Sequence, residues 1–232
     1  MLETLCFYFL CFLTYSFLGW IMEVCVSFYD EHKFINRGFL IGPCCSIYGW
    51  GCLLLIFFLE SSKDDLFGLM LKAIVICSIL EYFTSYIMEK LFHARWWDYS
   101  DKKFNLNGRI CLETMIPFGI LACIVLYFVQ PNLEYYYGLI SSDVLICISC
   151  LLFTIYLIDN LISFNIVFRI ASKINHLELK DSTEEISRLV KEKLKKAPYL
   201  YRRLLGAFPH FQVVLRKVEK KVTELGGKIR KR

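Results

Sequence analysis

Five long apolar runs constrain the fold of this 232-residue chain more than any other feature. Each run has at least 20 residues, the length that an α-helix needs to cross the hydrocarbon core of a bilayer. The composition agrees, because 56% of the residues are hydrophobic and only 21% are charged. We therefore predict an all-α polytopic membrane protein with five transmembrane helices, which cover approximately residues 5–29, 39–59, 66–92, 110–129 and 144–164.

Charge divides the chain into two parts. Residues 1–164 hold 9 basic and 15 acidic residues, whereas residues 165–232 hold 18 basic and 7 acidic ones. We interpret residues 1–164 as the membrane domain and residues 165–232 as a basic tail. The tail has apolar residues at helical spacing on either side of Pro198 and Pro209, so we expect it to be helical.

The distribution of Lys and Arg predicts which way the spans run. The loop after the first run carries Lys33 and Arg37, and residues 93–109 carry four more basic residues. The loops on the opposite side contain only Lys63. Because basic loops stay in the cytoplasm, we expect a multi-pass protein of the cell membrane with its N-terminus outside and its tail in the cytoplasm.

The first two runs resemble the third and fourth. The sequence Ile-Met-Glu occurs at residues 21–23 and again at residues 87–89, near the end of the first and third runs. A polar loop follows each time and a new apolar run follows the loop, so the chain would contain two similar helical hairpins plus one further helix. Repeats of this kind place substrate sites near their interface, although so few identities could also be coincidence.

Several short motifs carry a resemblance to a known family. They are residues 15–20 (YSFLGW), 36–40 (NRGFL), 42–43 (GP), 47–49 (IYG), 93–100 (HARWWDYS) and 105–109 (NLNGR). Over residues 10–165 the chain resembles the ABC-transporter type IV family of bacterial membrane proteins, also called CmpB-like permeases. The resemblance implies a multi-pass inner-membrane protein of the kind typical of Gram-positive bacteria, but it brings no substrate and no catalytic residue.

The sequence also indicates which binding partners and cofactors to expect. It has no GxxxxGK[ST] motif, so an ATP-driven transporter would need a separate ATPase subunit. Five spans make a small pore, so a homo-oligomer is the other expectation. The lipid bilayer is the remaining partner, and no nucleic-acid-binding module is recognisable. We expect no cofactor and no metal, because the 11 cysteines lie in apolar runs at irregular spacings and are best read as packing residues.

Ionisable residues inside the apolar runs are the candidates for function, because a charge inside a membrane is costly. Glu81 lies near the middle of the third run and shares a helix face with Ser85 and Glu89. We expect Glu81 to be either a neutral hydrogen-bonding acid or a proton or cation site. Four more carboxylates fall near the predicted cytoplasmic ends of the spans: Glu23, Glu89, Glu113 and Asp159.

Arginines fall at the same level, and two interpretations of this layer remain open. Arg37 and Arg109 could simply tie each loop to a carboxylate, with one pair in each hairpin. Alternatively, the layer could line a cytoplasm-facing cavity that binds a solute or a lipid headgroup. The candidate substrate-binding residues are Glu23, Arg37, Glu81, Glu89, Arg95, Asp98, Asn107, Arg109 and Glu113.

Three functions fit these observations. The first is a transporter permease subunit, favoured by the repeat, the intramembrane acids and the resemblance. The second is a membrane-embedded enzyme that acts on a lipid or lipid-linked substrate, with the carboxylates as acid and base. No catalytic spacing supports an enzyme, so catalysis is the weaker interpretation. The third is a non-catalytic scaffold or sensor, in which the polar layer is internal pairing only.

Overall fold

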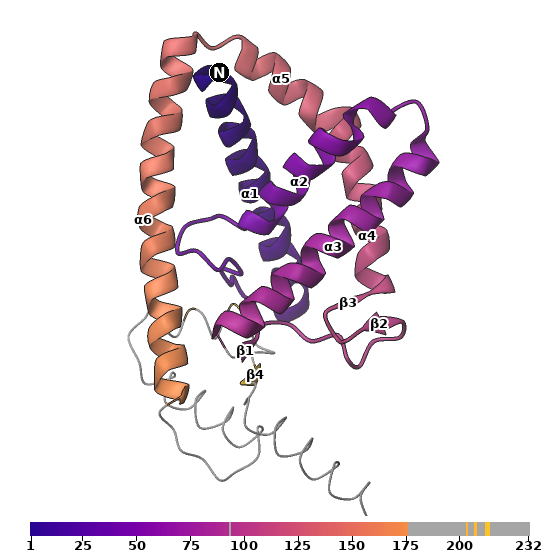
Figure 1. Ribbon diagram of the computed structural model, residues 1–232, viewed down its shortest axis with the longest axis vertical. Helices are drawn as coiled ribbons and strands as arrows, with labels where there is room; N and C mark the ends of the chain where they lie inside the picture. The colour runs from indigo at the N-terminus through magenta and orange to yellow at the C-terminus, as the bar shows by residue number, and fades with distance from the viewer. Residues whose placement is uncertain (93, 176–202, 204–206, 208–211, 214–232) are drawn as a thin grey trace, which may run out of the picture.

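The computed structural model describes residues 1–92, 94–175, 203, 207 and 212–213, and it is predominantly helical (Figure 1). The helices are α1 (Leu2–Glu31), α2 (Ser46–Leu59), α3 (Leu66–Phe92), α4 (Leu112–Ile124), α5 (Gln130–Gly138) and α6 (Ser142–Asn175), with a 3-10 turn η1 (Glu60–Ser62) and a π-helical turn η2 (Val125–Val129). Four two-residue strands complete the described elements: β1 (Ala94–Arg95), β2 (Asn105–Leu106), β3 (Ile110–Cys111) and β4 (Gln212–Val213).

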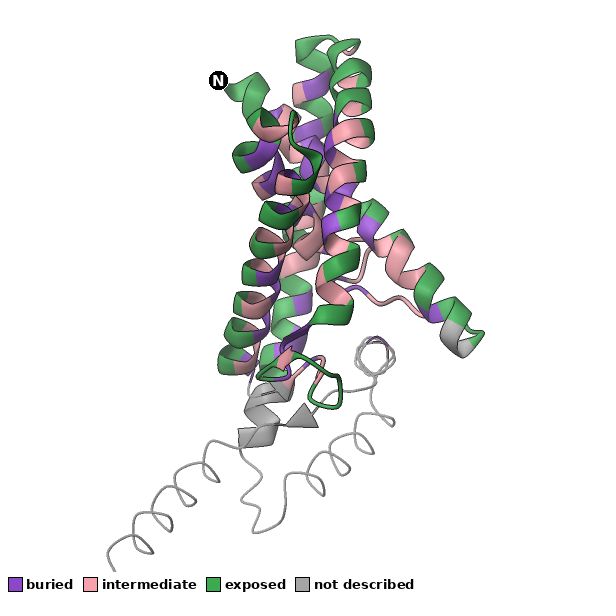
Figure 2. Cartoon of the chain, turned by 90° about the vertical axis from the view of Figure 1, so that its right-hand side faces the viewer, coloured by how far each residue is buried: buried purple, intermediate pink, exposed green. Residues whose placement is uncertain are grey.

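Within the described residues, four helical stretches are long and apolar enough to cross a membrane. They are Leu2–Tyr29, Leu66–Phe92, Leu112–Gly138 and Ser142–Arg169. Figure 2 shows exposed positions running along the full length of these helices, and many of them are large apolar side chains such as Phe83, Leu151 and Leu161. Apolar side chains facing outward are what a lipid-embedded surface requires, so the prediction of a polytopic helical membrane protein is confirmed.

The prediction of a second full-length helix over residues 39–59 is wrong. The helical part is Ser46–Ser62, about 25 Å long and shorter than the ~30 Å hydrocarbon core. Residues 39–45 are not helical, and in Figure 1 this stretch rises between α1 and α6 before α2 begins. Pro43 contributes to the break, because a proline disfavours helical backbone at the residue before it, here Gly42. Pro43 lies before the helix, which begins at Ser46.

The non-helical stretch satisfies its backbone groups with side chains. The amides of Ile41 and Gly42 donate to the two carboxylate oxygens of Asp159 on α6, at 2.8 and 2.7 Å. Asn36 donates to the carbonyl of Ile41 at 2.9 Å and accepts a hydrogen bond from Trp20 at 2.8 Å. An unpaired backbone group is costly in a membrane, so these contacts allow the irregular stretch to exist there.

The fourth span is longer than predicted. Helical backbone continues from α4 through η2 and α5 to Gly138, so the loop expected over residues 130–143 is mostly helix. Pro131 stands in the first turn of α5 and would break a regular α-helix. The π-helical turn just before it absorbs the irregularity. Buried Gln130 also accepts a hydrogen bond from Tyr15 of α1 at 2.6 Å, which holds this part of the helix against the core.

The last helix extends past the predicted end of its span. Since α6 runs to Asn175, Asp159 lies near the middle of the helix and not near its end, which corrects the predicted level of this residue. The predicted tail helices on either side of Pro209 lie outside the described residues. Of the tail residues that are described, Arg203 donates to the carbonyls of Gly38 and Phe39 at 3.0 and 2.9 Å, and β4 pairs antiparallel with β1.

The core lies where α1, α2, α3 and α4 meet, and α6 packs on α1. Helices α1 and α6 begin at the same end of the molecule, where Ser142 donates to Glu3 at 2.7 Å, and both run toward the opposite end (Figure 1). The predicted packing role suits Cys6, Cys11, Cys45 and Cys111, which are buried. It is wrong for Cys25, Cys147 and Cys150, which are exposed.

We predict that Asp159→Ala destabilises the protein strongly. The change leaves two half-buried backbone amides without acceptors, at up to about 1–3 kcal/mol for each. Asp159→Asn keeps one acceptor oxygen and should lose about half as much. The measurement is thermal unfolding in lipid nanodiscs, followed by tryptophan fluorescence. Asp143→Asn is the control, because Asp143 is exposed at the start of the same helix; equal losses for Asp143 and Asp159 would contradict the assignment.

Candidate functional site

The loop between α3 and α4 is shaped by a tight turn. Asn107 and Gly108 both have positive φ, at 54° and 67°, and the amide of Arg109 donates to the carbonyl of Leu106 at 3.0 Å. An Asn-Gly pair suits such a turn between antiparallel strands, and here it joins β2 to β3. A side chain at residue 108 would also overlap Asp98 and Ser100. The turn brings Arg109 back to the side of α3.

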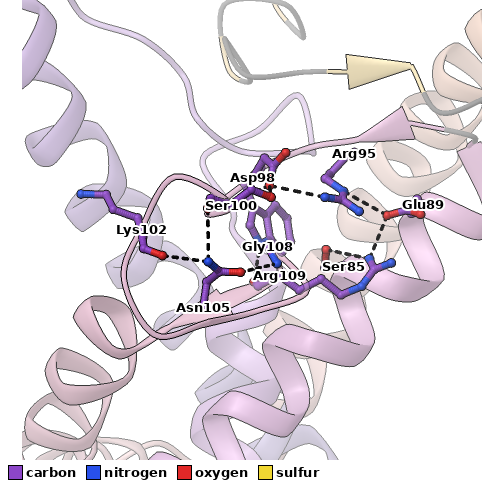
Figure 3. Close-up of polar contacts among 10 residues, drawn as sticks. Ser85, Glu89, Arg95, Asp98, Ser100, Lys102, Asn105, Gly108 and Arg109 are labelled. Carbon is purple, nitrogen blue, oxygen red and sulfur yellow. Dashed lines mark hydrogen bonds and ion pairs between the residues drawn. The ribbon is translucent and has the colours of Figure 1, made fainter. Parts of the chain in front are cut away.

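Arg109 forms a buried ion pair with α3. Its Nη1 lies 2.9 Å from Oε2 of Glu89 and donates to Oγ of Ser85 at 3.3 Å (Figure 3). The guanidinium also lies over the rings of Tyr82 and Tyr86, at 5.6 and 5.4 Å from their centroids. The residue is only 7% exposed, so the contacts with Glu89 and the two rings replace its hydration.

A second arginine reaches the same carboxylate oxygen. Nε of Arg95 lies 3.2 Å from Oε2 of Glu89, and its Nη1 lies 3.4 Å from Oδ1 of Asp98. Asp98 in turn accepts hydrogen bonds from the amide and the hydroxyl of Ser100, at 3.0 and 2.6 Å. Two guanidiniums and two carboxylates therefore balance in charge, and Figure 3 shows them as one connected cluster.

The first hairpin has a smaller counterpart. Nε of Arg37 lies 3.7 Å from Oε2 of Glu23, and the hydroxyl of Tyr48 donates to the other oxygen of Glu23 at 2.6 Å. The predicted arrangement of one arginine–carboxylate pair in each hairpin is confirmed. Glu23 and Glu89 are also the equivalent residues of the two Ile-Met-Glu sequences, so the repeat has a structural counterpart at these positions.

Glu81 stands apart from the ion pairs. It is 6% exposed, and its Oε1 accepts a long hydrogen bond of 3.5 Å from the hydroxyl of Tyr99. Its Oε2 has no hydrogen-bond partner among the described residues. Burial raises the pKa of the Tyr99 phenol, and the carboxylates of Glu81 and Glu23 raise it further. Tyr99 therefore lies near acids that belong to both hairpins.

The predicted layer is only partly assembled. Glu89, Arg95, Asp98 and Arg109 form one cluster, and Glu23 with Arg37 forms a separate pair. Glu113 is not part of either, because it pairs with Lys102 at 2.8 Å in an exposed position. Among the described residues, no group of three or more His, Cys, Asp or Glu side chains could hold a metal ion.

The sequence interpretation missed the part played by tyrosines. Asn107 donates to the hydroxyl of Tyr82 at 2.9 Å, while Tyr48 and Tyr99 each donate to an acid of the membrane domain. A signal was available, because Tyr48 and Tyr99 both lie inside motifs that carry the family resemblance.

Comparison with known proteins places these motifs in a family. The model of the family described as "Putative ABC-transporter type IV" matches residues 10–164. The chain belongs to this family. The matched region includes both hairpins and every candidate site residue named above, and it supports a membrane protein of the transporter kind. Comparisons with curated proteins and with solved structures give no match.

We predict that Glu89→Gln costs about 3–5 kcal/mol in the free energy of unfolding, because it leaves the buried guanidinium of Arg109 and the half-buried one of Arg95 with one carboxylate. The measurement is unfolding by sodium dodecyl sulfate in mixed micelles. Glu113→Gln is the matched control and should leave the transition unchanged, because its pair with Lys102 is exposed. Similar shifts for Glu89 and Glu113 would show that burial does not set the strength of the Glu89 cluster.

Proposed function

We propose that this protein is the permease subunit of a transporter and that its substrate binds where the two hairpin loops meet the membrane domain. The break before α2 is the observation that carries the proposal. Transporters commonly bind their substrates at interrupted helices, where unwound backbone and helix ends line the site. Non-helical backbone is tolerated at membrane depth only when protein covers it or when it lines a cavity, and residues 39–45 are such a stretch.

The polar side chains around the loops support binding of a solute. Two guanidiniums, those of Arg95 and Arg109, share one oxygen of Glu89, and Nε of Arg109 has no hydrogen-bond partner among the described residues. An anionic group of a solute, such as a carboxylate or a phosphate, could take the place of Glu89 and accept from both guanidiniums. The proposed binding residues are Glu23, Arg37, Glu81, Glu89, Arg95, Asp98, Asn107 and Arg109, without the outlying Glu113.

The proposal also includes the orientation of the chain in the membrane and its protein partners. The excess of Lys and Arg in residues 30–38, 93–109 and 165–232 supports a cytoplasmic position for both hairpin loops and for the tail. The substrate site would then open toward the cytoplasm, next to a basic tail that could receive a separate ATPase subunit or a second copy of this chain.

We predict that Arg109→Lys abolishes uptake without unfolding the protein, because an ammonium cannot reproduce the planar contacts of a guanidinium. The measurement is depletion of solutes from a defined, isotope-labelled medium by a deletion strain of the native host. The strain is complemented with the wild-type chain, with Arg109→Lys or with Asp143→Asn.

The wild-type chain and the exposed control Asp143→Asn should restore depletion of the same solute, whereas Arg109→Lys should not. Membrane abundance of each variant is checked by immunoblot. If deletion changes membrane lipids and leaves solute uptake intact, an enzyme that acts on lipids replaces the transporter. If only truncation of the tail has an effect, a scaffold or sensor replaces it.

A further inference from the structure

Glu81 is a carboxylic acid deep in an apolar helix. It lies 11 residues before the end of α3 at Phe92, which is about 17 Å along the helix axis. Its side chain is among the buried polar groups of the protein, at 6% exposure. A residue of this kind inside a membrane is a candidate functional site, such as part of an ion or proton pathway, because an ionised group there needs a compensating charge.

The cations of the polar layer are engaged elsewhere. Arg37 pairs with Glu23, and Arg109 pairs with Glu89 two turns below Glu81. No ion pair of the described residues includes Glu81, and its Oε2 has no hydrogen-bond partner there. Ser78 lies three residues earlier on the same helix face; it is also 6% exposed, and its Oγ has no partner among the described residues.

The groups that face Glu81 are acids and weak acids. They are Tyr99 from the loop after α3, Glu23 from α1, Tyr48 from α2 and Cys77 from the same helix. The carboxylate of Glu23 makes a positive charge at Glu81 favourable, and the hydroxyl of Tyr99 donates to Oε1 of Glu81 at 3.5 Å and leaves Oε2 available. The surroundings therefore supply oxygen atoms and negative potential, which suit a small cation.

We propose that Glu81 and Ser78 form the binding site of a small monovalent cation, either a proton or Na⁺. A proton would bind at Oε2 of Glu81, and Na⁺ would be bound by this oxygen together with Oγ of Ser78. The presence of the site does not depend on the proposed transport function, but its role as the site of a coupling ion does.

Arg109 connects the cation site to the substrate site. Its Nη1 already bridges Glu89 and Ser85, and Ser85 lies one turn below Glu81 on the same face. Loss of the cation from Glu81 would leave a buried negative charge one turn above the guanidinium and would draw Arg109 away from Glu89. Binding of the cation would return Arg109 to Glu89, so that cation and substrate act on the same arginine.

The test uses dicyclohexylcarbodiimide, an apolar reagent that adds to protonated carboxyl groups and leaves a stable N-acylurea. The wild-type protein in lipid nanodiscs is labelled as the pH is lowered from about 8 to about 6, with Na⁺ or with choline at equal ionic strength. Peptide mass spectrometry then identifies each labelled residue. We expect labelling of Glu81 that increases severalfold as the pH falls, with no labelling at that peptide in Glu81→Gln.

Comparing Na⁺ with choline shows whether the bound ion is Na⁺ or a proton. If Na⁺ protects Glu81 and choline does not, the ion is Na⁺, and Ser78→Ala should raise the Na⁺ concentration for half-protection about tenfold, or about 1.4 kcal/mol. If Na⁺ and choline act alike, the ion is a proton. Absence of labelling at Glu81 over the whole pH range, in protein that is labelled there once it is unfolded, would overturn the proposal. Labelling needs no substrate, so its failure is distinguishable from failure of the uptake experiment.

Discussion

The contact between Asp159 and the amides of Ile41 and Gly42 allows the rest of the membrane domain to take its form. The chain leaves α1 and does not become helical again until Ser46. The half-buried amides of Ile41 and Gly42 need an acceptor, and a carboxylate from the middle of α6 provides both of its oxygens. This contact also ties α6, more than a hundred residues later in the chain, to the start of α2.

The first hairpin is thereby different from the second although their sequences resemble each other. In the second hairpin α3 is followed by a continuous helical stretch from Leu112 to Gly138, and the loop between them folds back through an Asn-Gly turn that buries Arg109. In the first, residues 39–45 are irregular backbone and the helix that follows, Ser46–Ser62, is shorter. The two share one feature of chemistry, an acid at the end of Ile-Met-Glu that pairs with an arginine of the following loop.

The sequence predicts the parts of this fold that depend on apolar length. The third span agrees with α3 at both ends, because Leu66–Phe92 is an uninterrupted apolar run between polar loops. The predicted bounds of the second and fourth spans are wrong, and each error lies next to a proline. A hydropathy pattern does not register that Pro43 delays a helix, nor that a π-helical turn lets the helix continue past Pro131. The pairs Glu23–Arg37 and Glu89–Arg109 could be predicted from charge and level, whereas the partners of Asp159 could not, because backbone amides have no signature in the sequence.

The non-helical stretch before α2 receives charged partners on both its backbone donors and its backbone acceptors. Asp159 of α6 accepts from the amides of Ile41 and Gly42, and Arg203 of the tail donates to the carbonyls of Gly38 and Phe39. The tail also pairs β4 with β1, the strand that contains Arg95 of the Glu89 cluster. Arg203 and residues 212–213 thus contact both hairpin loops, next to Arg37 in the first and at Arg95 in the second. Within the described residues, the tail therefore touches both halves of the proposed binding site.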